Sequence, residues 1–222
     1  MRLRLALALL FTFLALPLRA AEIVRSFQAE IEVARTGKVL VTETIDIVSE
    51  GRQFRRGIYR DIPLSYMTEG GMAPVVLKVL KVERDGAPEG HLRSFQAGGN
   101  RVYFGSEDVA LPPGKHSYRW TYEIDHQISP AGTDDMFAWN VTGRWDFTIE
   151  KASATVKLPN GVKILATEQH AGTPDTPGDN VTMTTHGGAL TFTAIRALEP
   201  DEQLQFKIKI PRDAIEHPPA KN

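Results

Sequence analysis

The chain has 222 residues, of which 42% are hydrophobic and 24% are charged, and its formal net charge is −1. This composition is ordinary for a globular protein with a sizeable core, argues against wholesale disorder, and lacks the basic excess typical of nucleic-acid-binding domains. There are no cysteines, which excludes a disulfide framework, thiol catalysis and cysteine-based metal sites.

The N-terminus has the pattern of an export signal. Arg2 and Arg4 precede an apolar run from Leu5 to Leu18, and small residues follow at a cleavage point after Ala20. A run of about 14 apolar residues is short for a membrane span, which needs about 20. We therefore expect a signal peptide over residues 1–21, with an uncleaved N-terminal anchor as the alternative. Its removal leaves 23 basic and 27 acidic side chains, a net charge of −4.

Alternation of apolar and polar residues dominates the rest of the chain and predicts β-strands. The first such runs, 27–33 and 39–47, flank a turn at Thr36-Gly37, which predicts a hairpin with one solvent-exposed face. The apolar residues of both runs are expected to face a common core.

Glu43 breaks this alternation, because it shares the inward parity of Val41 and Ile45. A buried carboxylate is costly unless it is paired. We expect it to form an ion pair with an arginine, and Arg60 is the first choice. The alternative is a local β-bulge that returns Glu43 to solvent.

A charged segment follows the first two predicted strands. Arg52, Arg55 and Arg56 lead into the motif Gly57-Ile58-Tyr59-Arg60-Asp61-Ile62-Pro63, which we expect to be a loop and a candidate interaction site. Its arginines suit anionic headgroups or polymer phosphates. The simpler interpretation is a solvated loop with one arginine paired to Glu43, because the mature chain is not basic overall.

The remaining runs predict short strands separated by turns. Residues 127–135 are expected to form a loop, and Asn160-Gly161 predicts a two-residue hairpin. No stretch has a convincing helical period.

We expect an all-β antiparallel β-sandwich of immunoglobulin-like type with roughly a dozen strands. It should span 22–211, with a subdivision considered near 127–135, and a flexible tail over 212–222. The later predicted strands are 75–83, 92–95, 101–104, 115–124, 137–141, 145–149, 152–158, 162–166, 181–185, 190–194 and 203–210.

All three tryptophans lie between residues 120 and 145. Trp120 belongs to an aromatic row on one strand face, so we expect it in the core. Trp139 and Trp145 bracket Gly143 in the motif Trp139-Asn140-Val141-Thr142-Gly143-Arg144-Trp145. Exposed tryptophans of β-sandwich modules can stack on sugar rings, so a carbohydrate-binding module is an alternative to core packing for this pair.

Carboxylates near this motif raise a third hypothesis, a glycoside hydrolase. Asp134, Asp135, Asp146 and Glu150, with His126 upstream, supply the residue types that such catalysis needs. Adjacent acids in a loop are more often solvated, and spacing alone does not oppose two of them across a cleft. The histidines show no metal-ligand spacing, and no nucleotide or nucleophile motif is present. We therefore assign no catalytic, cofactor-binding or metal-binding residues.

Several motifs together resemble the bacterial DUF2207 family of predicted membrane proteins. The resemblance covers about 23–211 and depends on the order and spacing of these motifs, of which none is decisive alone. They are Ile23-Val24-Arg25-Ser26-Phe27, Val41-Thr42-Glu43-Thr44-Ile45, the Gly57-to-Pro63 motif, Gly114-Lys115-His116-Ser117-Tyr118, the Trp139-to-Trp145 motif, and Ile149-Glu150-Lys151-Ala152 leading to Leu158-Pro159.

The resemblance implies an extracytoplasmic β-rich domain, periplasmic or on the outer face of a bacterial membrane, without assigned catalytic residues. It also implies that family members continue into transmembrane helices, so membrane anchoring through a missing C-terminal region is an expectation. We hypothesise a non-enzymatic envelope domain that contacts another envelope protein or a cell-wall component. The expected surface combines Glu43, Gly57, Tyr59, Arg60, Asp61 and Pro63 with Trp139, Gly143 and Trp145.

Overall fold

The computed structural model describes residues 22–62, 65–68, 71–96 and 99–217. None of these residues lies in a helix, so none forms an apolar helix long enough to span a membrane. The expected signal peptide and Pro63 lie outside the described residues.

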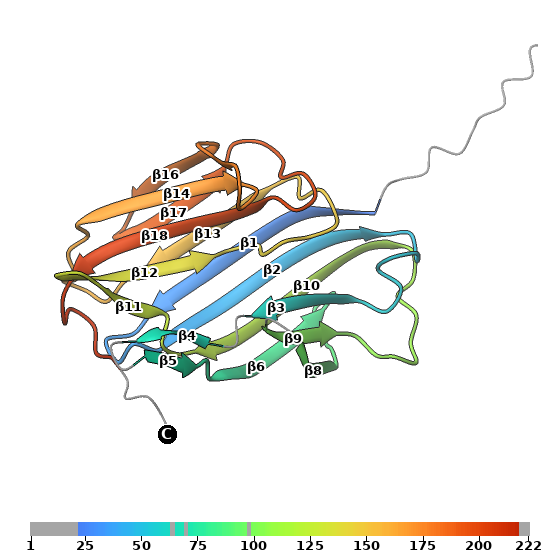
Figure 1. Cartoon of the computed structure of the whole chain (residues 1–222). Coiled ribbons are helices and arrows are strands. Elements are labelled where there is room, and N and C mark those ends of the chain that lie inside the picture. Colours follow the sequence, from blue (N-terminus) through green and yellow to red (C-terminus); the bar gives the residue numbers. More distant parts are fainter. Residues whose placement is uncertain (1–21, 63–64, 69–70, 97–98, 218–222) are drawn as a thin grey trace, which may run out of the picture.

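The back layer of the molecule is one eight-stranded sheet, the main sheet (Figure 1). Two of its central strands, Ile23–Val33 and Val39–Ser49, largely alternate between buried residues and residues that are at least partly exposed, as the sequence pattern predicts. In spatial order the strands of this sheet are β16 (Val181–His186), β17 (Ala189–Ala194), β13 (Ala152–Lys157), β1 (Ile23–Val33), β2 (Val39–Ser49), β10 (Gly114–Ile124), β6 (Leu77–Arg84) and β7 (Ala87–Pro88).

The front layer is divided into separate sheets (Figure 1). The second sheet contains β11 (Ile128–Ala131), β12 (Asp134–Asn140), β18 (Gln203–Pro211), β14 (Ala166–Gly172) and β15 (Pro177–Gly178). The third sheet contains β3 (Ile58–Ile62), β9 (Gly99–Phe104) and β8 (His91–Gln96). A two-stranded ribbon is formed by β4 (Ser65–Thr68) and β5 (Gly71–Pro74).

Aromatic side chains join the layers. Phe192 of the main sheet stacks on Phe206 of the second sheet, with ring centroids 4.6 Å apart. Phe104 of the third sheet lies 4.8 Å from Trp120 of the main sheet, measured between ring centroids. All four side chains are buried. The all-β sandwich-like architecture is therefore confirmed, and its core lies between the main sheet and the divided front layer.

Two features of the sheets differ from the expected sandwich. One central pair is parallel, because β1 runs in the same direction as β13. The tight turn at Asn160-Gly161 exists, with the N–H of Val162 donating to the carbonyl of Pro159. It does not close a hairpin, because the chain then crosses to the second sheet and pairs as β14 with β18. Local turn chemistry predicted the bend but not the change of layer.

Four segments have a secondary structure that differs from expectation, and one of them, the expected strand 162–166, is irregular up to Leu165 because β14 begins only at Ala166. The Gly57-to-Pro63 motif contains a strand, β3, whose alternation is hidden in the sequence because its central inward residue is Arg60. Residues 127–135 hold most of the β11–β12 hairpin rather than a loop. Residues 145–149 are not a strand; only Ile149 makes isolated bridges, to Val24 and Leu198.

In the segment expected to be a flexible tail, residues 212–217 are the ones that the structure describes. Through residue 217 they pack against the domain, where Ile215 is buried. Asp135, fully buried on β12, accepts hydrogen bonds from the backbone N–H of Asp213 at 3.1 Å and pairs with Nε2 of His217 at 2.9 Å. These contacts explain why the carboxylate of Asp135 is tolerated at a buried strand position.

Candidate functional site

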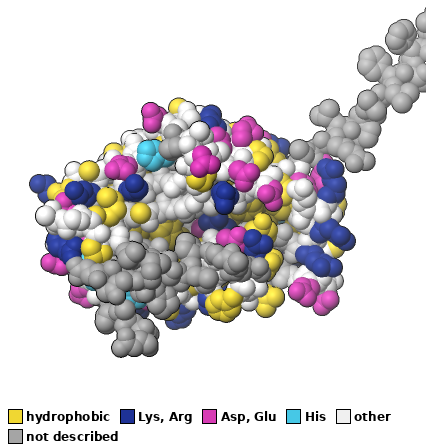
Figure 2. All heavy atoms as spheres, in the orientation of Figure 1, with side chains coloured by type: hydrophobic (Ala, Val, Ile, Leu, Met, Phe, Trp, Pro, Cys, Tyr) yellow, Lys and Arg dark blue, Asp and Glu magenta, His cyan; other side chains and the backbone are white. Residues whose placement is uncertain are grey.

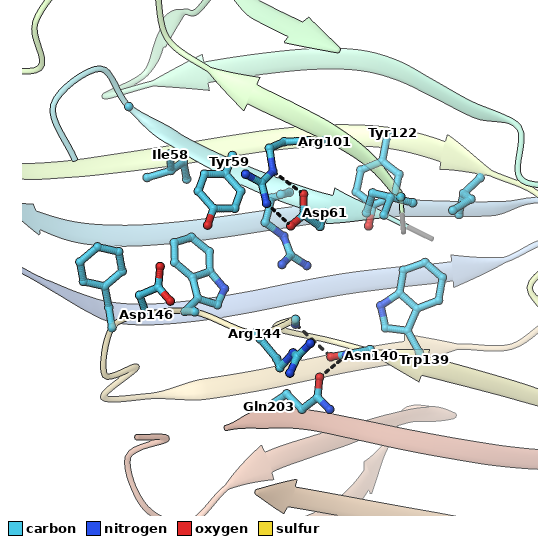
Figure 3. Close-up of a pocket in the computed structure, with 18 of the residues that line it drawn as sticks. Ile58, Tyr59, Asp61, Arg101, Tyr122, Trp139, Asn140, Arg144, Asp146 and Gln203 are labelled. Atoms are coloured by element: carbon cyan, nitrogen blue, oxygen red, sulfur yellow. Dashed lines mark hydrogen bonds and ion pairs between the residues drawn. The ribbon is translucent and has the colours of Figure 1, made fainter. Parts of the chain in front are cut away.

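An open groove with a volume of about 800 Å³ lies in the front layer, between the second and third sheets. One wall is β3 with Arg101 of β9, and the other is the end of β12 with residues 143–147 (Figure 3). We call this the front groove. Its volume lies within the range of ligand pockets. The groove brings the Gly57-to-Pro63 and Trp139-to-Trp145 motifs, which are far apart in the sequence, onto facing walls.

Beneath the front groove lies a buried ion pair between Glu43 and Arg60. Glu43 is fully buried at the centre of β2, and Arg60 of β3 is only 4% exposed. Nε of Arg60 donates to Oε2 of Glu43 at 2.7 Å, and Nη2 of Arg60 donates to Oε1 at 3.2 Å. The predicted pairing is confirmed, and the alternative of a solvent-exposed Glu43 is wrong.

Two aromatic side chains of β10 complete the environment of the carboxylate. Nε1 of Trp120 donates to Oε2 of Glu43 at 2.8 Å, and the hydroxyl of Tyr122 donates to Oε1 at 3.0 Å. β10 pairs with β2 so that Trp120 is directly opposite Glu43. Each carboxylate oxygen thus accepts two hydrogen bonds, which offsets the cost of burying the charge.

Arg60 also links the third sheet to the chain that leaves the second sheet. Its Nη2 donates to the carbonyl of Val141 at 3.0 Å, and its Nη1 donates to the carbonyl of Thr142. Its guanidinium lies 4.9 Å from the ring centroid of Phe27 on β1. One side chain therefore ties together the main sheet and both walls of the front groove.

Gly143 is the position in the second motif where a side chain does not fit. Its φ is +65°, a left-handed conformation that favours glycine, and an added Cβ would lie 2.9 Å from Nη1 of Arg60. Gly57 has a similar constraint in the first motif, because its φ is +117° and a Cβ would collide with the carbonyl of Phe104. The two glycines let the chain approach Arg60 and β9 closely.

The ionisation of these groups follows from their contacts. Burial alone would lower the pKa of Arg60, but attraction to Glu43 and their hydrogen bonds raise it above its usual value. Burial, followed by the charge of Glu43, raises the pKa of Tyr122 well above its ordinary range. The centre therefore holds a charged arginine and a neutral phenol, which keeps the tyrosine hydroxyl a donor to Glu43.

The rim of the front groove carries balanced charges. Arg101 makes two hydrogen bonds of 2.7 Å to the carboxylate of Asp61, and its guanidinium lies 3.8 Å from the ring centroid of Tyr59. On the opposite wall Arg144 and Asp146 are both exposed. In Figure 2 basic and acidic side chains are interspersed over this face. Arg52, Arg55 and Arg56 are exposed in an irregular segment, as the solvated-loop interpretation predicts, whereas β3 itself forms a wall with charges of both signs.

The two tryptophans of the second motif line the front groove, but both side chains are largely buried. Trp139 is 7% exposed and Trp145 is 8% exposed, although both line it. Nε1 of Trp145 donates to the carbonyl of Thr142 at 2.8 Å. Nε1 of Trp139 has no hydrogen-bond partner among the described residues. Neither ring forms an exposed platform, so sugar stacking remains a prediction without a matching surface.

The acidic residues of the hydrolase hypothesis are dispersed. Asp134 pairs with Lys209, and Glu150 pairs with Arg25. Asp135 binds the C-terminal residues, as described above, so the expectation that it is solvated is wrong. Asp146 is the member of this set that lines the front groove. No two of these carboxylates are brought together there, and the described residues contain no metal-binding cluster of histidine and acidic side chains.

The sequence did not predict that Trp120 and Tyr122 donate hydrogen bonds to Glu43. It also did not predict that Arg101, Asn140 and Arg144 line the groove. Trp120 and Tyr122 shared the correct face in the strand pattern. Only the register between β2 and β10 assigns them to Glu43. That register depends on chain pairing at long range, which single-sequence patterns do not contain.

The fold and site together define an all-β domain with a ligand-sized groove above a buried ion pair. The model of the DUF2207 family, described as "Predicted membrane protein (DUF2207) N-terminal domain", matches residues 24–210. The chain belongs to this family.

A curated relative is the uncharacterized protein YciQ of Escherichia coli (strain K12), 29% identical over 136 residues. The match covers 60% of this chain and 22% of that protein, so the chain spans only a minor part of its relative. Among solved structures, native yeast LTA4 hydrolase has a TM-score of 0.53 at 9% identity over 85% of this chain and 29% of that one. A second structure of native leukotriene A4 hydrolase, from Saccharomyces cerevisiae, has a TM-score of 0.51 at 10% identity, with the same coverage. These likenesses show the fold alone.

Proposed function

We propose that this chain is the extracytoplasmic part of a membrane-associated envelope protein and that it acts as a non-enzymatic binding module. The front groove is its working surface, and another envelope protein is its partner. The observation that carries the proposal is the construction of the groove, in which a buried ion pair with six hydrogen bonds holds two separate sheets around a ligand-sized opening.

The family description and the N-terminal sequence support the location. The family is described as the N-terminal domain of a predicted membrane protein, and the chain begins with a basic and apolar segment of export type. The balanced rim supports a protein partner over a polyanion, because phosphate-rich ligands favour an excess of positive charge.

The test is site-specific photocrosslinking in living cells that express the full chain. A photoreactive amino acid replaces Arg144 or Asp146 at the groove, and the matched control replaces Thr184, which is exposed on β16 at the far edge of the main sheet. We expect a discrete adduct with an envelope protein from the two groove positions and none from Thr184. Equal adducts at all three positions, or adducts with cytoplasmic proteins, would contradict the proposal.

A carbohydrate-binding module is the second candidate, because Trp139 and Trp145 both line the front groove. Soluble cell-wall fragments would then quench tryptophan fluorescence, and a Trp139→Ala variant with intact fold would lose that response. An unchanged emission spectrum at millimolar concentrations of the fragments would count against this candidate.

A further inference from the structure

The end of β12 offers unpaired backbone groups to the front groove. The N–H of Val141 donates to the carbonyl of Leu204 at 2.8 Å, just beyond the pairing of Asn140 with Gln205. Hydrogen-bonded residues alternate along an antiparallel pair, so the N–H and C=O groups of Ala138 and Asn140 point away from β18. On that side β11 pairs only as far as Phe137.

The facing strand, β3, has the same property. The N–H of Gly105 donates to the carbonyl of Gly90 at 3.0 Å, so odd-numbered residues of β9 bond to β8 and even-numbered residues bond to β3. The even-numbered residues are opposite Ile58, Arg60 and Ile62. The backbone groups of Tyr59 and Asp61 therefore point away from β9. Within the described residues β3 is one of the two edge strands of its sheet.

The two free edges face each other across the front groove. Figure 3 shows Tyr59 and Asp61 on one wall and Trp139 and Asn140 on the other, and the two walls run in opposite directions. An extended segment between them would be antiparallel to one edge and parallel to the other, as occurs in mixed sheets. It would join the second and third sheets into one continuous front layer.

The buried Nε1 donor of Trp139 is a second observation that favours an inserted extended segment. Nε1 of Trp139 is buried, lacks a partner among the described residues, and is directed towards the middle of the groove (Figure 3). Buried polar groups are nearly always hydrogen-bonded. A carbonyl oxygen of an inserted segment, together with the slight movement of neighbouring side chains that would admit it, would satisfy this donor.

From these observations we propose that the front groove binds an extended peptide segment of a partner protein by strand addition between β3 and β12. This inference depends on the function proposed above and names the ligand class. The floor includes Ile62, Ile124 and Trp139, so every second side chain of the peptide is apolar. Because Asp61 is paired with Arg101 and Arg144 is matched by Asp146, the peptide carries no large net charge.

The test uses a displayed library of random 12-residue peptides selected on the purified chain. The best binder is then resynthesised with one backbone amide methylated at a time, which removes the N–H without changing the side chain. A strand inserted between two edges uses its amides on both sides, so methylation at each of four consecutive central amides weakens binding about tenfold, equivalent to one good hydrogen bond. Addition to a single edge would give losses at alternate amides only and would overturn the proposal.

A pair of variants tests the protein side. Ala138→Pro removes an N–H that faces the groove and spares the ladder with β18, whereas Ala138→Ser keeps that N–H. We expect Ala138→Pro to weaken the selected peptide about tenfold or more and Ala138→Ser to stay within about twofold. Equal binding by both variants would overturn the proposal. Methylation alters only the peptide, so it remains decisive if the proline variant does not fold.

The failures of the two proposals are distinguishable. If no peptide is selected, but soluble wall fragments bind and are blocked by Trp139→Ala, strand addition is overturned and the groove remains a binding site. If photocrosslinks at Arg144 and Asp146 match those at Thr184, the groove itself is not the working surface.

Discussion

The two front sheets are held against the main sheet in different ways. The second sheet packs on the main sheet through aromatic rings, with Phe206 stacked on Phe192 of the main sheet. The third sheet packs through Phe104 as well, but it also places Arg60 on a buried carboxylate. Hydrophobic burial is non-directional, whereas hydrogen bonds have preferred distances and angles. The difference indicates that the ion pair determines where β3 lies relative to β12, and thus the shape of the groove.

The strongest way to break this arrangement is to remove one charge. Arg60→Ala leaves Glu43 buried without its main partner, and breaking a buried pair costs about 3–5 kcal/mol of unfolding free energy. Urea denaturation followed by circular dichroism measures the loss. A loss below about 1 kcal/mol, the value of a surface pair, would contradict the central role of the pair.

A double substitution sharpens the same comparison. Glu43→Leu together with Arg60→Met replaces the charges by apolar side chains, and such replacements are often near neutral in stability. We expect the double variant to be more stable than either single variant and yet to lose groove binding, because no side chain of β3 then donates hydrogen bonds to the carbonyls of Val141 and Thr142. Retained binding would show that the ion pair does not shape the groove.

Gly143→Ala should be the next largest effect, at about 2–4 kcal/mol. The alanine adds backbone strain at a φ of +65° and places a Cβ against Arg60, which its hydrogen bonds prevent from moving aside. The matched control is Gly187→Ala, because Gly187 has a φ of +57° and nothing within 4 Å of an added Cβ. Equal thermal shifts for the two variants would remove the argument for close contact at Arg60.

The two groove tryptophans should respond differently to phenylalanine. Trp145→Phe removes a hydrogen bond to Thr142 in addition to ring volume, whereas Trp139→Phe removes ring volume and a donor without a partner in the described residues. We expect Trp145→Phe to be more destabilising by about 1 kcal/mol. The effects on peptide affinity should have the opposite order. Trp139→Phe should weaken binding more than Trp145→Phe because, of the two Nε1 donors, only that of Trp139 lacks a partner among the described residues and is free to donate to a ligand.

The smallest predicted effect concerns Glu22, a partly buried carboxylate that accepts its hydrogen bonds from backbone N–H groups. Burial opposes the ionisation of Glu22, but backbone N–H groups of Arg52, Gln53 and Glu50 outweigh it and lower its pKa below the ordinary 4.5. A lowered folded-state pKa gives stability that is present above the unfolded-state pKa and lost as pH falls through the folded-state pKa. Glu22→Gln should therefore reduce stability by a few tenths of a kcal/mol at pH 7 and by less at pH 3. A larger loss of stability for Glu22→Gln at pH 3 than at pH 7 would contradict a lowered pKa of Glu22.

The alternation of apolar and polar residues was sufficient to predict the all-β class of the fold and one part of the site, the pairing of Glu43 with Arg60. Glu43 stood at an inward position with no local partner, and burial of its charge demanded an arginine, which the structure supplies as Arg60. The same logic failed for β3, because an inward arginine looks like a loop residue when its partner lies 17 residues away.

Other features depend on long-range pairing that the sequence does not encode locally. Asp135 is buried because residues 213 and 217 return to bind it. The free edges of β3 and β12 result from strand order, which places no strand between them within the described residues. The shape of the groove was therefore beyond prediction, although the sequence already combined the two motifs that line it into one expected surface.

Amide hydrogen exchange measured residue by residue by NMR tests the central claim most directly. In the free chain the amides of Tyr59, Asp61, Ala138 and Asn140 should exchange much faster than those of Arg60 and Trp139, which are paired with β9 and β18. Addition of the selected peptide should slow all four. Slow exchange of these four amides in the free chain, or no change when the peptide binds, would contradict the account.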